Sequence, residues 1–178
     1  LIVKGDSHIL VDCGTRTPEA LHLLGFPITQ IRNFIITHSH ADHIGGLEEV
    51  MLVNRYVARK KPTVIITESY QQLLWEGSLR GGCSFNERHN SRHLYFTDFW
   101  NVIRPERIPG ADRELAIARI GEIEIALFRT KHIPDSTQTW NDSCLSYGLI
   151  IDGKVLFTSD TRFDPEMVKT YERKYRFQ

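Results

Sequence analysis

The sequence has few cysteines, no long apolar run and no excess of charge of either sign. Its three cysteines are far apart and form no CxxC pair, so we expect no disulfide framework and a reducing, cytoplasmic compartment. No run of about 18 apolar residues occurs, which excludes a membrane-spanning helix by length. The 22 basic residues equal the 22 acidic residues, so no net charge favours nucleic acid or an anionic membrane. A nucleic-acid partner stays open only through a local basic patch.

The start and the length of the sequence bear on its domain organisation. The chain opens with Leu1 rather than methionine and begins as if already inside a strand, so we expect the natural start to lie further upstream. A length of 178 residues fits one domain with a substantial core. We therefore expect a single domain over residues 1–178, with an irregular insertion near 80–110.

Local patterns predict alternating strands and helices, followed by hairpins. Two short strands should surround a Gly5-Asp6-Ser7 turn, and Thr17 should be the N-cap of a short helix that Gly25 ends. Further strands are expected over 33–37 and 63–68, helices over 47–57 and 70–79, and hairpins around 121–122 and 152–153. In the first of these helices, Val57 should face the core, and Arg55, Arg59 and Lys60 should face water. This order favours a layered α/β protein with mixed sheets.

The stretch THSHADHIGG, residues 37–46, concentrates metal-binding side chains at the end of a predicted buried strand. His38 and His40 alternate along extended backbone, so both imidazoles should point the same way. Asp42 and His43 follow after the chain turns and can serve a second position nearby. Imidazole nitrogens with carboxylate oxygens suit zinc, manganese or iron. The stretch therefore predicts a metal site, which can be dinuclear.

This HxHxDH stretch resembles the signature of the metallo-β-lactamase superfamily, whose members are metal-dependent hydrolases with an αββα sandwich. Three other residues match that family's pattern and occur in the same order as in the family. With them, the resemblance covers nearly the whole chain. Asp12 resembles the aspartate that supports the histidine loop. His132 resembles the third histidine ligand of the first metal, and Asp160 resembles the carboxylate that bridges both metals.

The resemblance implies a metallo-β-lactamase-like αββα sandwich with two divalent metal ions, zinc favoured over manganese or iron. One metal would be held by His38, His40 and His132, the other by Asp42 and His43, with Asp160 between them. A metal-bound hydroxide would be the nucleophile, and Asp42 would orient it or accept its proton. The family's further histidine ligand, downstream of the bridging aspartate, has no counterpart before Gln178, so we expect a fragment that is incomplete at both termini.

Several hydrolase chemistries stay open within this fold. An aspartate at position 160 and the spacing of 89 positions from His43 to His132 favour the RNase Z and cyclic-nucleotide phosphodiesterase branch. Balanced charge favours a small or cyclic phosphodiester over a long RNA, although an RNA 3′-end is not excluded. A thioester or lactam hydrolase is the alternative enzyme, and a catalytically silent metal-binding interaction module is the alternative of another class. Ser136 and Thr137 are candidate substrate contacts, and a homodimer stays open.

Overall fold

The chain forms two compact units, which are described one at a time. The computed structural model describes residues 1–175 and 177. Unit 1 comprises residues 1–3 and 8–104, and unit 2 comprises residues 4–7 and 105–178. That the whole chain acts as one domain stays a prediction. Among the described residues, no helix has the length and apolar character needed to cross a bilayer.

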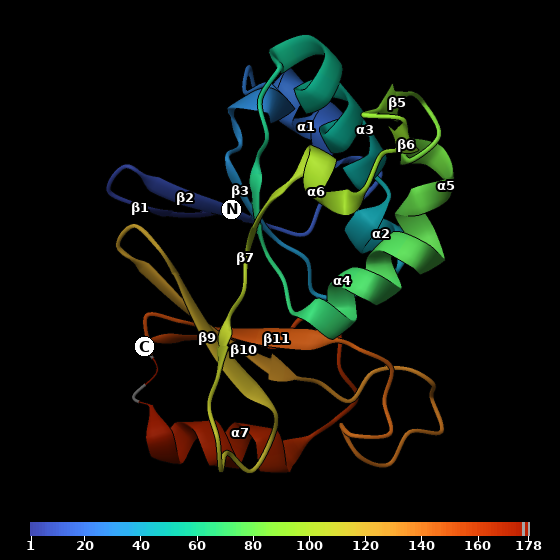
Figure 1. Ribbon diagram of the computed structural model, residues 1–178. Helices are drawn as coiled ribbons and strands as arrows, with labels where there is room; N and C mark the ends of the chain where they lie inside the picture. The colour runs from blue at the N-terminus through green and yellow to red at the C-terminus, as the bar shows by residue number, and fades with distance from the viewer. Residues whose placement is uncertain (176, 178) are drawn as a thin grey trace. The chain divides into compact units, whose positions relative to one another are not determined.

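Unit 1 is built on a five-stranded sheet in which four neighbouring strands run parallel (Figure 1). The strand order is β1-β2-β3-β4-β7. The strands are β1 (Ile2–Lys4), β2 (Ser7–Val11), β3 (Asn33–Ile35), β4 (Thr63–Ile65) and β7 (Asn101–Ile103). Phe34 pairs with Leu10 on one side and Val64 on the other, and it is fully buried. Parallel strands buried on both faces have near-continuous apolar runs, as here.

Helices connect these strands, and most of them are short. They are α1 (Thr17–Leu23), the 3₁₀ turn η1 (Ile28–Gln30), α2 (Ala41–Ile44), α3 (Leu47–Val53), the π turn η2 (Asn54–Ala58), α4 (Glu68–Leu74), the π turn η3 (Trp75–Leu79), α5 (Arg80–Cys83) and α6 (Phe96–Phe99). A two-stranded hairpin joins β5 (Arg88–His89) to β6 (Arg92–His93). Residues 80–109 are thus more regular than the sequence suggests, because they supply helices and one strand of the main sheet.

Three local expectations in unit 1 are wrong. Thr17 is the first helical residue of α1 rather than its N-cap, and no side chain caps this helix. Val57 is 73% exposed, because the π turn after Val53 changes the helical period on which the core-facing prediction depended. Arg55 is partly buried rather than solvated, and its guanidinium binds Glu87.

Unit 2 is an antiparallel sheet covered by one helix. The strand order is β12-β11-β10-β9-β8, and the predicted hairpins are confirmed. The strands are β8 (Glu106–Arg107), β9 (Leu115–Ile120), β10 (Ile123–Arg129), β11 (Tyr147–Ile151) and β12 (Val155–Phe157). Figure 1 shows α7 (Pro165–Lys174, red) along this sheet.

The core of unit 2 lies between this sheet and α7. Met167 and Tyr171, four residues apart on one helical face, pack on Phe128 and Ile150. A Cβ at Gly148 would lie 2.3 Å from the Phe128 ring. Glycine at that position therefore lets the Phe128 ring lie across the neighbouring strand.

Candidate metal-binding residues

The HxHxDH loop begins where the apolar strand β3 ends. Ile35 and Ile36 are buried, and so are Thr37 and His38, at 0% exposure each. His40 has extended backbone and precedes the four-residue helix α2, which carries Asp42 and His43. The loop thus leaves the carboxyl end of a parallel strand, the usual position of functional side chains in open α/β sheets.

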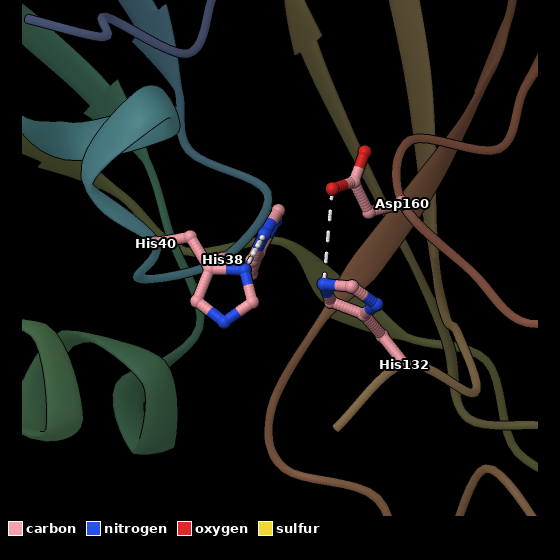
Figure 2. Close-up of side chains that lie close together, drawn as sticks. All are labelled: His38, His40, His132 and Asp160. Atoms are coloured by element: carbon pink, nitrogen blue, oxygen red, sulfur yellow. Dashed lines mark hydrogen bonds and ion pairs between the residues drawn. The ribbon is translucent and has the colours of Figure 1, made fainter. Parts of the chain in front are cut away.

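His38 and His40 present ring nitrogens to each other. His38 Nε2 lies 3.0 Å from His40 Nδ1, and the rings are nearly perpendicular, with centroids 4.7 Å apart. Figure 2 shows this pair. On the other side of the His38 ring, Nδ1 lies 3.1 Å from Thr37 Oγ1. These two facing nitrogens are close enough to share one cation.

Asp12 binds the loop from the end of β2. Its Oδ1 accepts a hydrogen bond from the Thr37 backbone N–H at 2.7 Å, and its Oδ2 accepts one from Thr37 Oγ1 at 2.8 Å. The same Oδ2 lies 2.7 Å from His43 Nδ1. Burial raises the pKa of Asp12, while the contacts with His43 and Thr37 oppose that rise. Asp12 also has a left-handed backbone (φ 59°), a strained conformation for a non-glycine residue.

This carboxylate determines how His43 is presented. An ionised carboxylate at Asp12 can only accept, which places the proton on Nδ1 and leaves the lone pair of the neutral ring on Nε2, as in metal-ligating histidines. His43 Nε2 lies 3.6 Å from Asp42 Oδ2. The Asp42 side chain is 77% exposed and that of His43 is 15% exposed. His43 and Asp42 thus form an imidazole–carboxylate pair in addition to that of His43 and Asp12.

Close backbone contact holds the end of β2 against α2. A Cβ at Gly14 would lie 2.0 Å from the Asp42 carbonyl oxygen, so only glycine fits there. The Cys13 N–H donates to the His43 carbonyl at 2.8 Å, and the Gly46 N–H donates to the Cys13 carbonyl at 2.9 Å. The segment after β2 and the HxHxDH loop therefore form one hydrogen-bonded assembly.

Unit 2 brings together the remaining two predicted ligands. His132 Nε2 lies 3.8 Å from Asp160 Oδ2 (Figure 2). Thr130 Oγ1 donates to the Asp160 carbonyl at 3.3 Å, and the Arg162 N–H donates to the Lys131 carbonyl at 2.6 Å. The segments that follow β10 and β12 are thus bound to each other beside the two side chains.

The backbone at His132 is held by residues that the sequence did not indicate. Ser143 Oγ accepts from the N–H groups of His132 and Ile133 at 3.1 and 3.3 Å. Arg129 Nη2 in turn donates to the carbonyls of Ser143 at 2.8 Å, Trp140 at 3.2 Å and Cys144 at 3.3 Å. The Arg129 side chain is 6% exposed. Thr37 was likewise missed, since nothing in the sequence marks contacts over such separations.

The two predicted substrate contacts lie in the loop after His132. Ser136 is exposed, whereas Thr137 is buried at 5% exposure. The Thr137 carbonyl accepts from Arg162 Nη1 at 3.2 Å. Within the part of the chain that the structure describes, Thr137 Oγ1 has no hydrogen-bond partner. Substrate contact by either residue stays a prediction.

Comparison with known proteins identifies the fold. The metallo-β-lactamase fold protein YhfI from Bacillus subtilis aligns with a TM-score of 0.62 and 18% identity, over 94% of this chain and 56% of that one. The expected α/β fold of the metallo-β-lactamase type is therefore confirmed.

The same comparison identifies the family. An anti-Pycsar protein Apyc1 of Paenibacillus sp. (strain J14) is 33% identical over 168 residues, which cover 94% of this chain and 61% of that protein. An anti-Pycsar protein Apyc1 of Bacillus phage vB_BsuM-Goe3 is 37% identical over 161 residues, covering 88% and 58%. The chain thus spans about three fifths of the length of these relatives. A family model described as anti-Pycsar protein Apyc1 matches residues 1–178, and the chain belongs to that family.

Proposed function

We propose that this protein is a metal-dependent phosphodiesterase that hydrolyses a small or cyclic phosphodiester, such as a cyclic nucleotide. The observation that carries the proposal is the HxHxDH loop, with the His38 and His40 nitrogens 3.0 Å apart and His43 bound to Asp12. The family match over the whole chain supports it. An aspartate rather than a cysteine at position 160 also agrees with a phosphodiesterase.

The proposed ligands are those that the superfamily resemblance implies. His38, His40 and His132 would hold one divalent cation, Asp42 and His43 a second, and Asp160 would contact both. In support, each unit pairs its own candidates within 4 Å, and imidazole with carboxylate suits zinc, with manganese and iron as alternatives. The supporting carboxylate on His43 is the arrangement that ligating histidines use.

The chemistry divides between the cations and the chain. When bound, divalent cations would lower the pKa of water and polarise a phosphoryl oxygen. Asp42, with an exposed carboxylate next to His43, would orient the attacking water and hold its proton at Oδ2. Asp12 and Thr37 would keep the loop in one geometry, which reduces the reorganisation needed during the reaction.

Hydrolysis by the zinc-loaded chain tests this function. We expect cleavage of bis(p-nitrophenyl) phosphate or of at least one 3′,5′-cyclic nucleotide, with activity lost in EDTA and restored by zinc or manganese. His38→Ala and Asp160→Ala should each lower kcat/KM by at least about 100-fold, because a lost ligand removes a cation. His89→Ala is the matched control, since His89 is an exposed histidine on β5.

Other outcomes would identify a different protein. Cleavage of a thioester or a lactam without cleavage of any phosphodiester would assign the alternative hydrolase. Metal binding without hydrolysis of any of these substrates would assign a silent metal-binding module. Activity that survives both His38→Ala and Asp160→Ala would contradict the proposed ligand set.

Ser136 and Thr137 remain proposed substrate contacts. Thr137→Val keeps the shape of the side chain and removes its hydroxyl, and Ser136→Ala does the same at an exposed position. A contact role requires that KM rise while zinc affinity stays unchanged. An unchanged KM in both variants would remove them from the proposed site.

A further inference from the structure

A second cluster of charged side chains lies at the end of η2, in unit 1. A cavity of about 330 Å³ opens there. It is lined by four cations, one tyrosine and two carboxylates: Arg55, Arg59, Lys60, Lys61, Tyr56, Glu87 and Asp98. The four cations fall within seven consecutive residues of a chain whose overall charge is zero. The cavity is thus a local basic patch in a neutral protein.

Part of this charge is already neutralised inside the cavity wall. Arg55 donates from Nε to Glu87 Oε1 at 2.9 Å, and from Nη1 to the Asp98 carbonyl at 3.0 Å. Asp98 is bound by Arg92, with 2.6 Å between Oδ2 and Nη1. Both carboxylates of the cavity therefore already have arginine partners.

Three cations remain without a carboxylate. Among the described residues, no ion pair includes Arg59, Lys60 or Lys61, and Lys61 Nζ donates only to the Thr97 carbonyl, at 2.8 Å. A cation at a helix C-terminus is favoured by the helix dipole, which accounts for one such residue. Three in succession around one cavity exceed that need. All three side chains are exposed, so water screens much of their mutual repulsion, and a bound anion would reduce the remainder.

The cavity is separate from the HxHxDH loop. That loop ends at Gly46, where α3 begins, and the cavity lies at the opposite end of the continuous α3 and η2 helix. Twelve residues of helix extend roughly 18 Å. An anion bound at Arg59 and Lys60 would therefore not contact the proposed ligands of unit 1.

We propose that this cavity binds the phosphate group of a small ligand, with Arg59, Lys60 and Lys61 as its cationic contacts. A phosphate carries close to two negative charges near neutral pH, which matches several uncommitted cations better than a carboxylate would. Tyr56, 43% exposed, lines the cavity, and Arg55 Cζ lies 5.8 Å from its ring centroid. A nucleobase can stack against the exposed part of this ring. A nucleoside monophosphate thus fits the cavity better than inorganic phosphate does.

Titration calorimetry of the full chain with inorganic phosphate and with a nucleoside 5′-monophosphate tests the proposal. Both zinc-loaded and EDTA-treated protein should bind phosphate at this cavity, since the cavity contains none of the proposed metal ligands. Arg59→Asn with Lys60→Gln should weaken binding at least about tenfold. Asparagine suits the left-handed backbone of Arg59 (φ 52°), so this variant should fold.

The matched control is Arg32→Asn with Lys169→Gln, which removes the same charges from exposed positions outside the cavity. It should leave the affinity unchanged. Tyr56→Leu should remove the advantage of the nucleotide over inorganic phosphate while leaving phosphate binding intact.

Three results would overturn the proposal. The first is equal affinity in the cavity variant and the parent chain. The second is equal weakening in the control, which would indicate a general charge effect. The third is much tighter, equally variant-sensitive binding of a short single-stranded RNA, which would assign the patch to a nucleic acid instead. None of these depends on whether the protein hydrolyses phosphodiesters.

Discussion

At the scale of single residues, Asp12 is the side chain on which the HxHxDH loop most depends. It accepts two hydrogen bonds from Thr37 and contacts His43 while buried. Asp12→Asn leaves one acceptor oxygen and turns an NH₂ group toward donors. We expect zinc affinity to fall about 10- to 100-fold and the free energy of unfolding to fall by about 1–3 kcal/mol.

Competition with a chromophoric zinc chelator measures the first effect, and urea denaturation of EDTA-treated protein measures the second. Asp6→Asn is the control, because Asp6 is an exposed aspartate in the preceding turn. Unchanged zinc affinity in Asp12→Asn would show that Asp12 supports the fold but not the metal site.

Arg129 has a comparable supporting role in unit 2. Its guanidinium reaches three carbonyls of the loop that contains Ser143, and Ser143 holds the backbone of His132. Lysine offers a point charge rather than a planar fork, so Arg129→Lys should free this loop and cost about 2–4 kcal/mol of stability. Amide hydrogen exchange should accelerate at His132 and Ile133 in particular.

The control for that variant is Arg119→Lys, an exposed arginine on the same sheet. Faster exchange throughout unit 2, with no preference for His132 and Ile133, would mean that Arg129 supports the sheet in general rather than this loop.

At the scale of elements, helix α7 depends on its N-cap. Asp164 Oδ1 accepts from the Met167 N–H at 3.2 Å, and Oδ2 accepts from Arg113 Nη2 at 2.7 Å. Both side chains are at most 10% exposed. Asp164→Asn keeps the cap but leaves Arg113 without its charge partner, at a cost of about 3 kcal/mol. Asp164→Ala also removes the cap and should cost about 1 kcal/mol more.

Urea denaturation followed by circular dichroism compares the two variants. Glu166→Gln, in the same first helical turn and exposed, should change stability by less than about 0.5 kcal/mol. Equal losses in Asp164→Asn and Asp164→Ala would show that the ion pair alone stabilises α7.

Helix α6 has a pH-dependent cap. Asp98 accepts from the Tyr95 N–H at 2.7 Å, and the hydrogen bond with Arg92 lowers the pKa of Asp98 from 3.8 to about 2. A carboxyl whose pKa is lowered by folding stabilises the protein above its unfolded pKa, and this contribution is lost as pH falls from about 4 to 2. Arg92 is about one third exposed, so solvent screening reduces the expected contribution to about 1 kcal/mol.

The measurement is the difference in unfolding free energy between the parent chain and Asp98→Asn across pH 2–7. The difference should be constant above pH 5 and shrink below pH 4. A difference that does not change with pH would mean that the carboxylate charge contributes nothing.

The helices and strands that could be predicted from the sequence are those long enough to show a hydrophobic period. Alternation over 115–120 and 123–129, with a Gly-Glu turn between, predicted the β9–β10 hairpin correctly. The short elements between 80 and 109 show no period, and β7 exists because its three residues pair with β4. Helix α7 was missed although Asp164-Pro165 is a regular helix start.

The residues of the candidate site could likewise be predicted only in part. The HxHxDH loop is contiguous, so its ligands could be read from one stretch, whereas Asp12, His132 and Asp160 came only from a family resemblance. Ser143 and Arg129 act through backbone contacts, and no residue type or spacing indicates such contacts.

At the scale of the whole molecule, the proposed ligands of one cation come from both compact units. His38 and His40 belong to unit 1, and His132 and Asp160 belong to unit 2. If one zinc ion needs both sets, zinc should stabilise the folded chain as a whole, by about 2.7 kcal/mol at a free concentration 100 times the dissociation constant. Thermal unfolding in EDTA and in buffered zinc measures this increment.

Ligand variants make that test specific. His38→Ala and His132→Ala should each abolish most of the zinc increment, and the double variant should lose no more than either single variant, because both remove the same ion. Such non-additivity is expected only for residues that act together. Additive losses, or an increment that survives in one single variant, would mean that each unit binds zinc by itself and that the proposed shared ligand set is wrong.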